Sequence, residues 1–279
     1  MRVATTRREI KARGLTFDVF EGGPEDGRPV LLLHGFPQDH REFDPVLPRL
    51  HAAGLRTYAL DQRGYSAGAR PPAVGDYRLA EPTADAVAVI EALGLESAHV
   101  VGHDWGAQVA WLVAGQHPER VRSLTAISVP HPRALGLALR VRPTQRARFV
   151  YQAFFRSPGA ERLLLAGDGA LLKAMMRAIG DRAALYADAM REPGRLTGGL
   201  NWYRALSPKA LKGLGVITVP TTYVWSDHDP VFRITAALRT ADWVRADYRL
   251  VAMRDIGHWV PEEAPKATAD AIIRRVTEA

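Results

Sequence analysis

Short apolar runs alternate with helical patterns along most of the chain, and this alternation limits the possible folds more than any other feature. The apolar runs are Arg28–His34, Arg56–Asp61, Ala98–Gly102, Ser123–Val129, Ile217–Trp225 and Tyr248–Val251. The helical patterns are Thr83–Leu93, Ala107–Gln116, Thr235–Asp242 and Glu262–Thr277. Strands that are apolar along their whole length are buried on both faces, which is typical of a parallel sheet covered by helices. We therefore predict an α/β fold with a mostly parallel, doubly wound sheet.

The rhythm changes after residue 130. From 131 to 209 the sequence is helix-like and rich in Ala, Leu, Arg and Met, with no convincing strand, and the alternation then resumes. A helical block inside an α/β pattern indicates an insertion into one domain. We therefore predict a core formed by residues 1–130 and 210–279, with residues 131–209 as an inserted helical cap, or lid.

Composition narrows the class of protein. With 279 residues, 47% hydrophobic and 24% charged, the chain is an ordinary globular one, which excludes disordered and coiled-coil chains. The net charge of +7 comes from basic residues scattered among acidic ones, without a nucleic-acid-binding motif. No apolar run approaches the roughly 18 residues that span a bilayer, and Met1–Gly14 is not a secretory signal. With no cysteine as well, we expect a cytoplasmic monomer or homodimer with no nucleic-acid or membrane partner.

The segment Gly102-His103-Asp104-Trp105-Gly106 stands between a predicted strand and a predicted helix. Small residues two before and two after a central residue are typical of a nucleophile elbow, where the strand and helix backbones nearly touch. Here the central residue is an aspartate, an anion that can attack carbon directly and form an alkyl ester. Its place at a helix amino terminus favours the ionised carboxylate. The alternative interpretation is an ordinary glycine-flanked loop with a capping aspartate.

Other positions fit the same chemistry. The segment at 34–37 follows a strand, where a backbone N–H can help to bind an oxyanion, and Asp229 and His258 each follow a later strand. Asp104, Asp229 and His258 stand in the nucleophile–acid–histidine order of α/β-hydrolases. Asp227 competes with Asp229 for the role of the acid, but Asp229 stands directly before a Pro-Val step and is the preferred candidate.

These motifs give the chain a resemblance to a known family. Over nearly its full length it looks like an α/β-hydrolase of the epoxide hydrolase group, a relative of the haloalkane dehalogenases. The matching motifs are HGFP (34–37), DQRGYSAGARP (61–71), GHDWGA (102–107), YQAFFRSPG (151–159), NWYRA (201–205), SDHDPV (226–231) and IGHW (256–259). The two motifs of the predicted cap are the more specific ones, because in epoxide hydrolases their tyrosines bind the epoxide oxygen.

The resemblance implies a reaction and its catalytic residues. Asp104 attacks a carbon of an epoxide substrate, while Tyr151 and Tyr203 donate hydrogen bonds to the ring oxygen. His258, oriented by Asp229, then takes a proton from the water that hydrolyses the alkyl ester, and the product is a vicinal diol.

The resemblance also implies binding residues. The backbone N–H groups of Phe36 and Trp105 are expected to form an oxyanion hole, and both residues should contact substrate together with Gln152 and Trp259. We expect no cofactor and no metal, because no His/Asp/Glu cluster has metal-ligand spacing. His258 must be neutral to act as a base, so activity should fall as the pH drops through its pKa, ordinarily about 6.5.

The chain departs from the family pattern in two places. Gln38 stands where many relatives have an acid, and Ser66 and Gly68 interchange the usual Gly and Ser. Neither departure removes a catalytic group, and both are expected at the rim of the pocket. His34 and His103 are expected to be structural.

Two other functions remain open. A haloalkane dehalogenase normally has an Asn or a second Trp to help Trp105 bind halide, but Phe36 replaces that Asn. A haloacid dehalogenase of the fluoroacetate type carries Arg after the nucleophile, at the position of Trp105. The other function, besides a dehalogenase, is that of a non-hydrolytic, ligand-binding homologue, with Tyr151 and Tyr203 as packing residues. Turnover of an epoxide panel, with halide release assayed in parallel, separates these functions.

Overall fold

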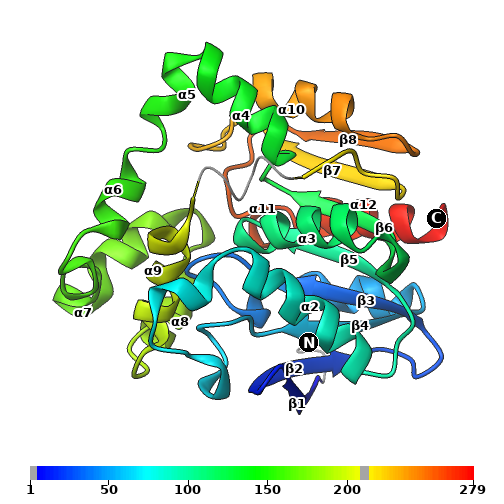
Figure 1. The fold of residues 1–279 in the computed structure, drawn as a ribbon, viewed down its shortest axis with the longest axis horizontal. Coiled ribbons are helices and arrows are strands. Elements are labelled where there is room, and N and C mark those ends of the chain that lie inside the picture. The colour runs from blue at the N-terminus through cyan, green and yellow to red at the C-terminus, as the bar shows by residue number, and fades with distance from the viewer. Residues whose placement is uncertain (1–4, 208–213) are drawn as a thin grey trace.

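The computed structural model describes residues 5–207 and 214–279, which form one sheet with helices on both of its faces (Figure 1). In this part of the chain, eight strands lie in the order β1-β2-β4-β3-β5-β6-β7-β8. The strands are β1 Thr6–Ala12, β2 Leu15–Gly22, β3 Arg28–Leu33, β4 Leu55–Leu60, β5 Ala98–His103, β6 Val121–Ile127, β7 Thr221–Ser226 and β8 Tyr248–Met253. All neighbours from β4 to β8 are parallel, whereas β2 is antiparallel to both β1 and β4. The predicted mostly parallel α/β fold is confirmed.

Helices cover both faces of the sheet, as the apolar strands require. The core helices are α1 Leu47–Ala52, α2 Ala80–Ala92, α3 Trp105–Gln116, α10 Ile234–Arg239, α11 Val260–Glu263 and α12 Pro265–Thr277. Along β3, Val30 and Leu32 pack with residues of α1 and α12, while Leu31 and Leu33 pack on the opposite face with α2 and α3. Because side chains alternate between two buried faces, β3 is apolar at every position of its second half.

A further set of helices lies between β6 and β7 in the chain. These helices are α4 Pro132–Val141, α5 Pro143–Ala147, α6 Tyr151–Arg156, α7 Ala160–Met175, α8 Arg182–Ala189 and α9 Arg195–Ala205. Figure 1 shows them in green to yellow-green, with α6 to α9 gathered at one end of the sheet. No strand interrupts them within residues 132–205. The predicted end of the insertion, at 209/210, lies outside the described residues.

Three local features differ from the prediction. The hairpin β1–β2 was not expected, because β1 is an edge strand in which Ile10 and Ala12 are the buried positions. The strand predicted from Ile217 begins at Thr221, and Ile217 instead forms an isolated bridge with Val244. The last helical pattern is divided into α11 and α12, because Pro265 begins a new helix.

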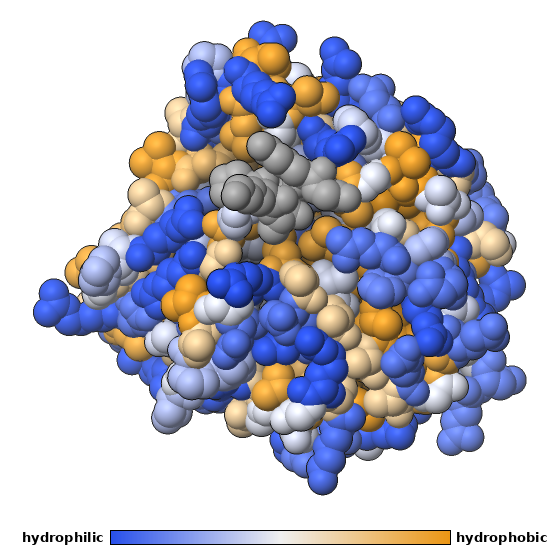
Figure 2. All heavy atoms as spheres, in the orientation of Figure 1, coloured by the Kyte–Doolittle hydropathy of each residue, from blue (hydrophilic) through white to orange (hydrophobic). Residues whose placement is uncertain are grey.

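Hydrophilic side chains are spread over the face shown in Figure 2, with smaller apolar areas between them. Within the described residues, no helix is both long and apolar enough to cross a membrane.

Candidate active site

The predicted nucleophile elbow is a sharp turn between β5 and α3. Asp104, the residue between them, has φ 49° and ψ −117°. A backbone conformation of this kind costs a non-glycine residue on the order of 1–3 kcal/mol and needs support from its surroundings. A Cβ at Gly102 would collide with the carbonyl of Gly106, and a Cβ at Gly106 would collide with the carbonyl of Leu33. Glycine at both positions therefore allows the close backbone packing that holds Asp104 in the turn.

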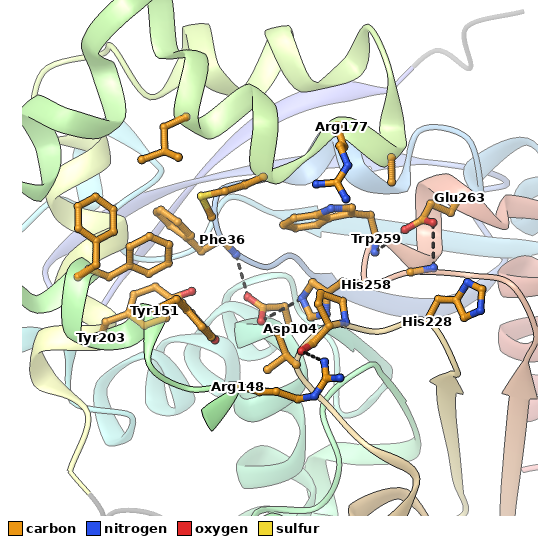
Figure 3. A pocket seen from close by; sticks show the side chains of 18 residues that line it. Phe36, Asp104, Arg148, Tyr151, Arg177, Tyr203, His228, His258, Trp259 and Glu263 are labelled. Carbon is orange, nitrogen blue, oxygen red and sulfur yellow. Dashed lines mark hydrogen bonds and ion pairs between the residues drawn. The ribbon is translucent and has the colours of Figure 1, made fainter. Parts of the chain in front are cut away.

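His258 lies between two carboxylates. Its Nδ1 atom is 2.9 Å from Oδ2 of Asp229. Its Nε2 atom is 3.4 Å from Oδ2 of Asp104, and Figure 3 shows these two side chains next to each other. Asp104 follows β5, Asp229 follows β7 and His258 follows β8. The carboxyl ends of these parallel strands meet at one edge of the sheet, which brings together three residues far apart in the sequence.

Asp229, rather than Asp227, is the acid beside His258. The second oxygen of Asp229 accepts the backbone N–H groups of Val231 at 2.6 Å and Phe232 at 3.0 Å, which fixes the carboxylate. Asp227 is exposed and accepts the N–H of Asp255 at 2.8 Å instead. Asp227 and Asp229 are only two positions apart in the loop after β7, but Asp229 is buried and Asp227 is exposed.

Electrostatics favour an ionised Asp104 beside a protonated His258. Burial acts to raise the pKa of Asp104, but the imidazole of His258 and the N–H of Phe36 outweigh it and lower the pKa. Burial also acts against the charged form of His258, but the carboxylates of Asp229 and Asp104 raise its pKa to about 10. The ordinary value of about 6.5 assumed from the sequence is therefore wrong for His258 while Asp104 remains ionised.

The other oxygen of Asp104 faces a backbone donor. Phe36 N–H donates to Oδ1 at 3.0 Å. Trp105 is the first residue of α3, so its N–H has no partner within the helix and is a second candidate donor. The two oxygens of Asp104 therefore have different surroundings, with Oδ1 at the predicted oxyanion hole and Oδ2 beside His258.

Two tyrosines from the inserted helices complete the site. Tyr151 begins α6 and Tyr203 belongs to α9, and their rings lie 6.2 Å apart, on the side of Asp104 away from His258 (Figure 3). The Tyr203 ring packs edge-on against those of Phe36 at 5.4 Å and Trp105 at 4.9 Å. Burial and the negative charge of Asp104 raise the pKa of both tyrosines, so both hydroxyls keep their protons at neutral pH.

Two cavities meet at these groups. The larger has a volume of about 580 Å³ and the smaller of about 300 Å³, and Asp104, Tyr151 and Tyr203 line both. The larger is also lined by Phe36, Phe154, Phe155, Met175, Arg148, Arg177, His258 and Trp259, among others. The smaller is also lined by Trp105, Gln108, Val129, Leu135, Leu139, Gln152 and Phe232, among others. The reactive carboxylate therefore sits at the junction of two mainly apolar spaces.

Each of the four residues predicted to contact substrate lines one of the two cavities. Phe36 and Trp259 line the larger cavity, whereas Trp105 and Gln152 line the smaller one. Sequence reasoning missed the cavity residues that belong to no motif. Leu135, Leu171 and Arg177 are examples, and nothing local in the sequence marks them.

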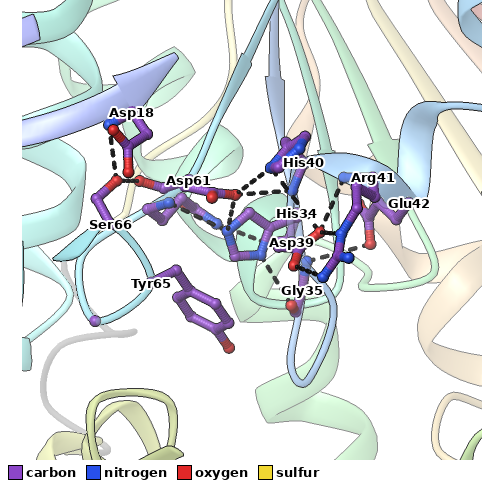
Figure 4. Close-up of polar contacts among 12 residues, drawn as sticks. Asp18, His34, Gly35, Asp39, His40, Arg41, Glu42, Asp61, Tyr65 and Ser66 are labelled. Carbon is purple, nitrogen blue, oxygen red and sulfur yellow. Dashed lines mark hydrogen bonds and ion pairs between the residues drawn. The ribbon is translucent and has the colours of Figure 1, made fainter. Parts of the chain in front are cut away.

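The departures from the family pattern do not reach the pocket. Gln38, Ser66 and Gly68 line neither cavity, so the expectation that they shape its rim is wrong. Ser66 instead accepts the N–H of Asp18 and donates to the carbonyl of Asp61, and this joins the loop to β2 (Figure 4).

One group of side chains resembles a metal site. Ligand atoms of Asp39, His40 and Asp61 lie within 4.8 Å of one another (Figure 4). However, Asp39 already forms 2.6 Å ion pairs with Arg41 and Arg195, and His40 Nδ1 lies 2.9 Å from Asp61. Because these partners supply the compensating positive charge, the cluster is a network that joins the inserted helix α9 to the core.

A family model for the alpha/beta hydrolase fold matches residues 28–265. The chain therefore belongs to the alpha/beta hydrolase fold family, which accords with the elbow, the sheet order and the position of His258.

Within this family, similar relatives include epoxide hydrolases. The chain is 34% identical to Epoxide hydrolase A of Mycobacterium tuberculosis, with 98% of each chain covered. It is 32% identical to the AB hydrolase superfamily protein YfhM of Bacillus subtilis, with 95% of each covered. Among solved structures, Epoxide Hydrolase A from Mycobacterium thermoresistibile matches with a TM-score of 0.82 and 28% identity over 98% of each chain.

Proposed function

We propose that this protein is an epoxide hydrolase that converts an epoxide to a vicinal diol through an ester on Asp104. One observation carries the proposal. Two tyrosines from different helices, the buried Tyr203 and the partly buried Tyr151, stand beside an aspartate whose other side is occupied by a histidine–aspartate pair. The names of the relatives support the same reaction.

In the first step, Oδ2 of Asp104 attacks a ring carbon and the bond from that carbon to the ring oxygen breaks. Tyr151 and Tyr203 donate hydrogen bonds to this oxygen, and one of them supplies its proton as negative charge develops. The raised pKa of each tyrosine keeps it protonated until then. The resulting tyrosinate regains a proton that ultimately comes from His258.

Ester formation itself prepares His258 for the second step. The ester has no negative charge, so one of the two carboxylates that raise the pKa of His258 is lost. The ring then releases its proton and becomes a base. It takes a proton from water as water attacks the carbonyl carbon of the ester, while the Phe36 N–H stabilises the oxyanion. Cleavage of the ester releases the diol and restores ionised Asp104 beside protonated His258.

The paired cavities support a substrate shape. An epoxide whose oxygen lies between the tyrosines has its two carbons beside Asp104, where the cavities meet. A substituent on each carbon then has a space of its own. We therefore propose internal epoxides, with one larger and one smaller apolar group, as the preferred substrates. The helices α4–α9 are the proposed lid over this pocket.

Two other functions fit less well. In a dehalogenase a second indole N–H would assist Trp105, but the N–H of the neighbouring Trp202 donates to the carbonyl of Arg63 at 3.0 Å. A pure ligand-binding protein needs neither the His258–Asp229 pair nor protonated tyrosines beside a carboxylate. A cytoplasmic location and a monomeric or homodimeric state remain predictions from the sequence.

The test is to stop the reaction between its two steps. His258→Gln, mixed with trans-stilbene oxide, should accumulate an adduct on the Asp104 peptide that mass spectrometry detects. In the wild type, one turnover in ¹⁸O-labelled water should place the label in Asp104 and leave the diol light. Label that appears only in the diol would contradict the ester mechanism.

A further inference from the structure

A buried carboxyl group outside both cavities is connected to the catalytic machinery. Glu42 lies in a short 3-10 turn, His40–Phe43, and its side chain is fully buried. Its Oε2 atom is 3.1 Å from Nδ1 of His103 and 3.4 Å from the backbone N of Gly35. Its Oε1 atom has no hydrogen-bond partner within the described residues. A buried ionised carboxylate with so few donors would be costly.

The hydrogen bonds of the neighbouring His103 indicate which of its ring nitrogens carries the hydrogen. His103 is fully buried, and its Nε2 atom is 2.8 Å from the backbone carbonyl oxygen of His258. A carbonyl only accepts, so Nε2 must carry a hydrogen. Burial and the positive charge of His258 lower the pKa of His103 to about 4, so the ring is neutral and its Nδ1 has a lone pair.

A lone pair on Nδ1 needs a donor, and the atom facing it is a carboxyl oxygen of Glu42. Only a protonated carboxyl can donate there. Burial raises the pKa of Glu42 well above its ordinary value, and the nearby carboxyls of Glu262, Asp104 and Asp39 act in the same direction. The tautomer of His103 and the surroundings of Glu42 thus agree on a neutral acid.

This hydrogen-bonded chain joins two parts of the site. At one end is Gly35, directly before Phe36, whose N–H binds Asp104. At the other end is the backbone of His258, whose carbonyl also accepts the hydroxyl of Ser128 at 3.0 Å. Both ends act in ester hydrolysis, one as the oxyanion donor and one as the base.

We propose that Glu42 is a positioning residue that works as a neutral carboxylic acid and holds two groups in place for ester hydrolysis, His258 through His103 and the Phe36 N–H through Gly35. This inference rests on the proposed function of His258. The fold family and the sequence motifs do not mark Glu42, because it stands between the motifs and touches no cavity.

The test compares two substitutions of one residue. Glu42→Gln keeps an uncharged donor for Nδ1, as in the protonated acid, but loses the longer 3.4 Å contact with the Gly35 N–H, because Oε2 makes both contacts in the wild type. Glu42→Leu removes both. We expect Glu42→Leu to slow hydrolysis of the Asp104 ester roughly 10- to 100-fold, the scale of a small misplacement of catalytic groups, and to leave ester formation nearly unchanged. Glu42→Gln should keep both rates within a few-fold of the wild type, roughly threefold, because the shorter of the two hydrogen bonds is conserved.

Rapid-quench measurements with trans-stilbene oxide separate the two rates. Since slower hydrolysis makes the ester accumulate, kcat and KM should fall together in Glu42→Leu. Leu47→Ala is the control for general destabilisation. It leaves a cavity beside helix α1 and removes none of these hydrogen bonds. Infrared spectroscopy gives a readout besides activity, since the C=O stretch of a protonated carboxylic acid should be present in the wild type and absent in Glu42→Gln.

Three results would overturn the inference. One is a Glu42→Gln variant as slow as Glu42→Leu, which would mean that a neutral donor facing Nδ1 of His103 does not hold these groups in place. Another is an equal loss in both steps, or the same loss in Leu47→Ala. The third is the absence of the carboxylic acid band. If the wild type forms no ester at all, the proposed function itself fails, and the hydrolytic role of Glu42 fails with it.

Discussion

The two halves of the site rest on different kinds of support. Asp104, Asp229 and His258 follow neighbouring parallel strands, so backbone hydrogen bonds of the sheet set their mutual positions. Tyr151 and Tyr203 stand on inserted helices, which depend on side-chain packing and a few polar contacts with the core. The positions of the proposed nucleophile and base therefore depend on the sheet, whereas the positions of the two tyrosines and the shape of the pocket depend on how the helices pack. In this arrangement substrate range can change without disturbing the nucleophile.

The largest loss of activity is expected from a substitution among the residues that follow the strands. Asp104→Asn keeps the size of the side chain but removes the nucleophile, so turnover should fall roughly 10⁴-fold or more. The measurement is diol formation, with an intact-mass check that the amide has not hydrolysed. Residual activity within about tenfold of the wild type would mean that water attacks the epoxide directly.

Loss of both tyrosine hydroxyls should be almost as severe. Each of Tyr151→Phe and Tyr203→Phe should lower the rate of ester formation roughly 10²-fold, and the double variant should abolish it. The phenyl rings preserve the packing, so the thermal unfolding temperature should change little. Tyr186→Phe is the matched control, since Tyr186 belongs to inserted helix α8 and its hydroxyl donates to Glu262 outside both cavities. Near-normal ester formation in the double variant would mean that Tyr151 and Tyr203 do not take part in the reaction.

Asp229 should matter more for the second step than for the first. Asp229→Asn leaves His258 without its orienting carboxylate, and ester hydrolysis should slow roughly 10²- to 10³-fold while ester formation falls less. Asp227→Asn is the exposed counterpart and should be close to the wild type. The two rates come from rapid-quench experiments, and a larger loss in ester formation would contradict the assignment.

The two steps should differ in their response to pH. Ester formation needs ionised Asp104, whose pKa is lowered, so its rate should be nearly constant between about pH 6 and about pH 9. Ester hydrolysis needs neutral His258, so its rate should rise with pH until it passes the pKa of that ring in the ester. This pKa should lie below the value of about 10 in the free enzyme, because the charge of Asp104 is absent. Hydrolysis that slows as pH rises would reverse the role of His258.

The smallest effect is expected at the contact between helix α9 and the core. Trp202→Phe removes one hydrogen bond between α9 and the carbonyl of Arg63, worth about 1 kcal/mol, and also leaves a cavity where the buried indole packs beside Trp105. The unfolding temperature should fall by at least about 2 °C, and KM should change more than the rate of ester formation. A change confined to ester formation would mean that this contact positions the chemistry itself.

The sequence predicted most of the core because its signals are local. The apolar runs follow from burial of strands on both faces, and the elbow follows from two glycines around one aspartate. Asp229 could be preferred over Asp227 because it stands directly before a Pro-Val step, and in the structure Asp229 lies beside His258. The hairpin β1–β2 was missed because a charged edge strand has little apolar pattern.

The inserted helices were less accessible to sequence reasoning. Their existence was evident from composition, but the meeting of the two cavities depends on distances between helices and sheet. The contact between Glu42 and His103 was likewise not predictable, because 61 positions separate the two residues and Glu42 belongs to no motif.

The amino-acid sequence by itself determined the alternating core, the strained turn at Asp104 and the identity of the groups that follow β7 and β8. These depend on short-range backbone geometry, which a few neighbouring residues set. Tertiary structure decided the raised pKa of His258, the neutral state assigned to Glu42 and the division of the pocket into two spaces. These properties arise from burial and from charges brought together across the fold, because electrostatic energies depend on distance in space and not along the chain.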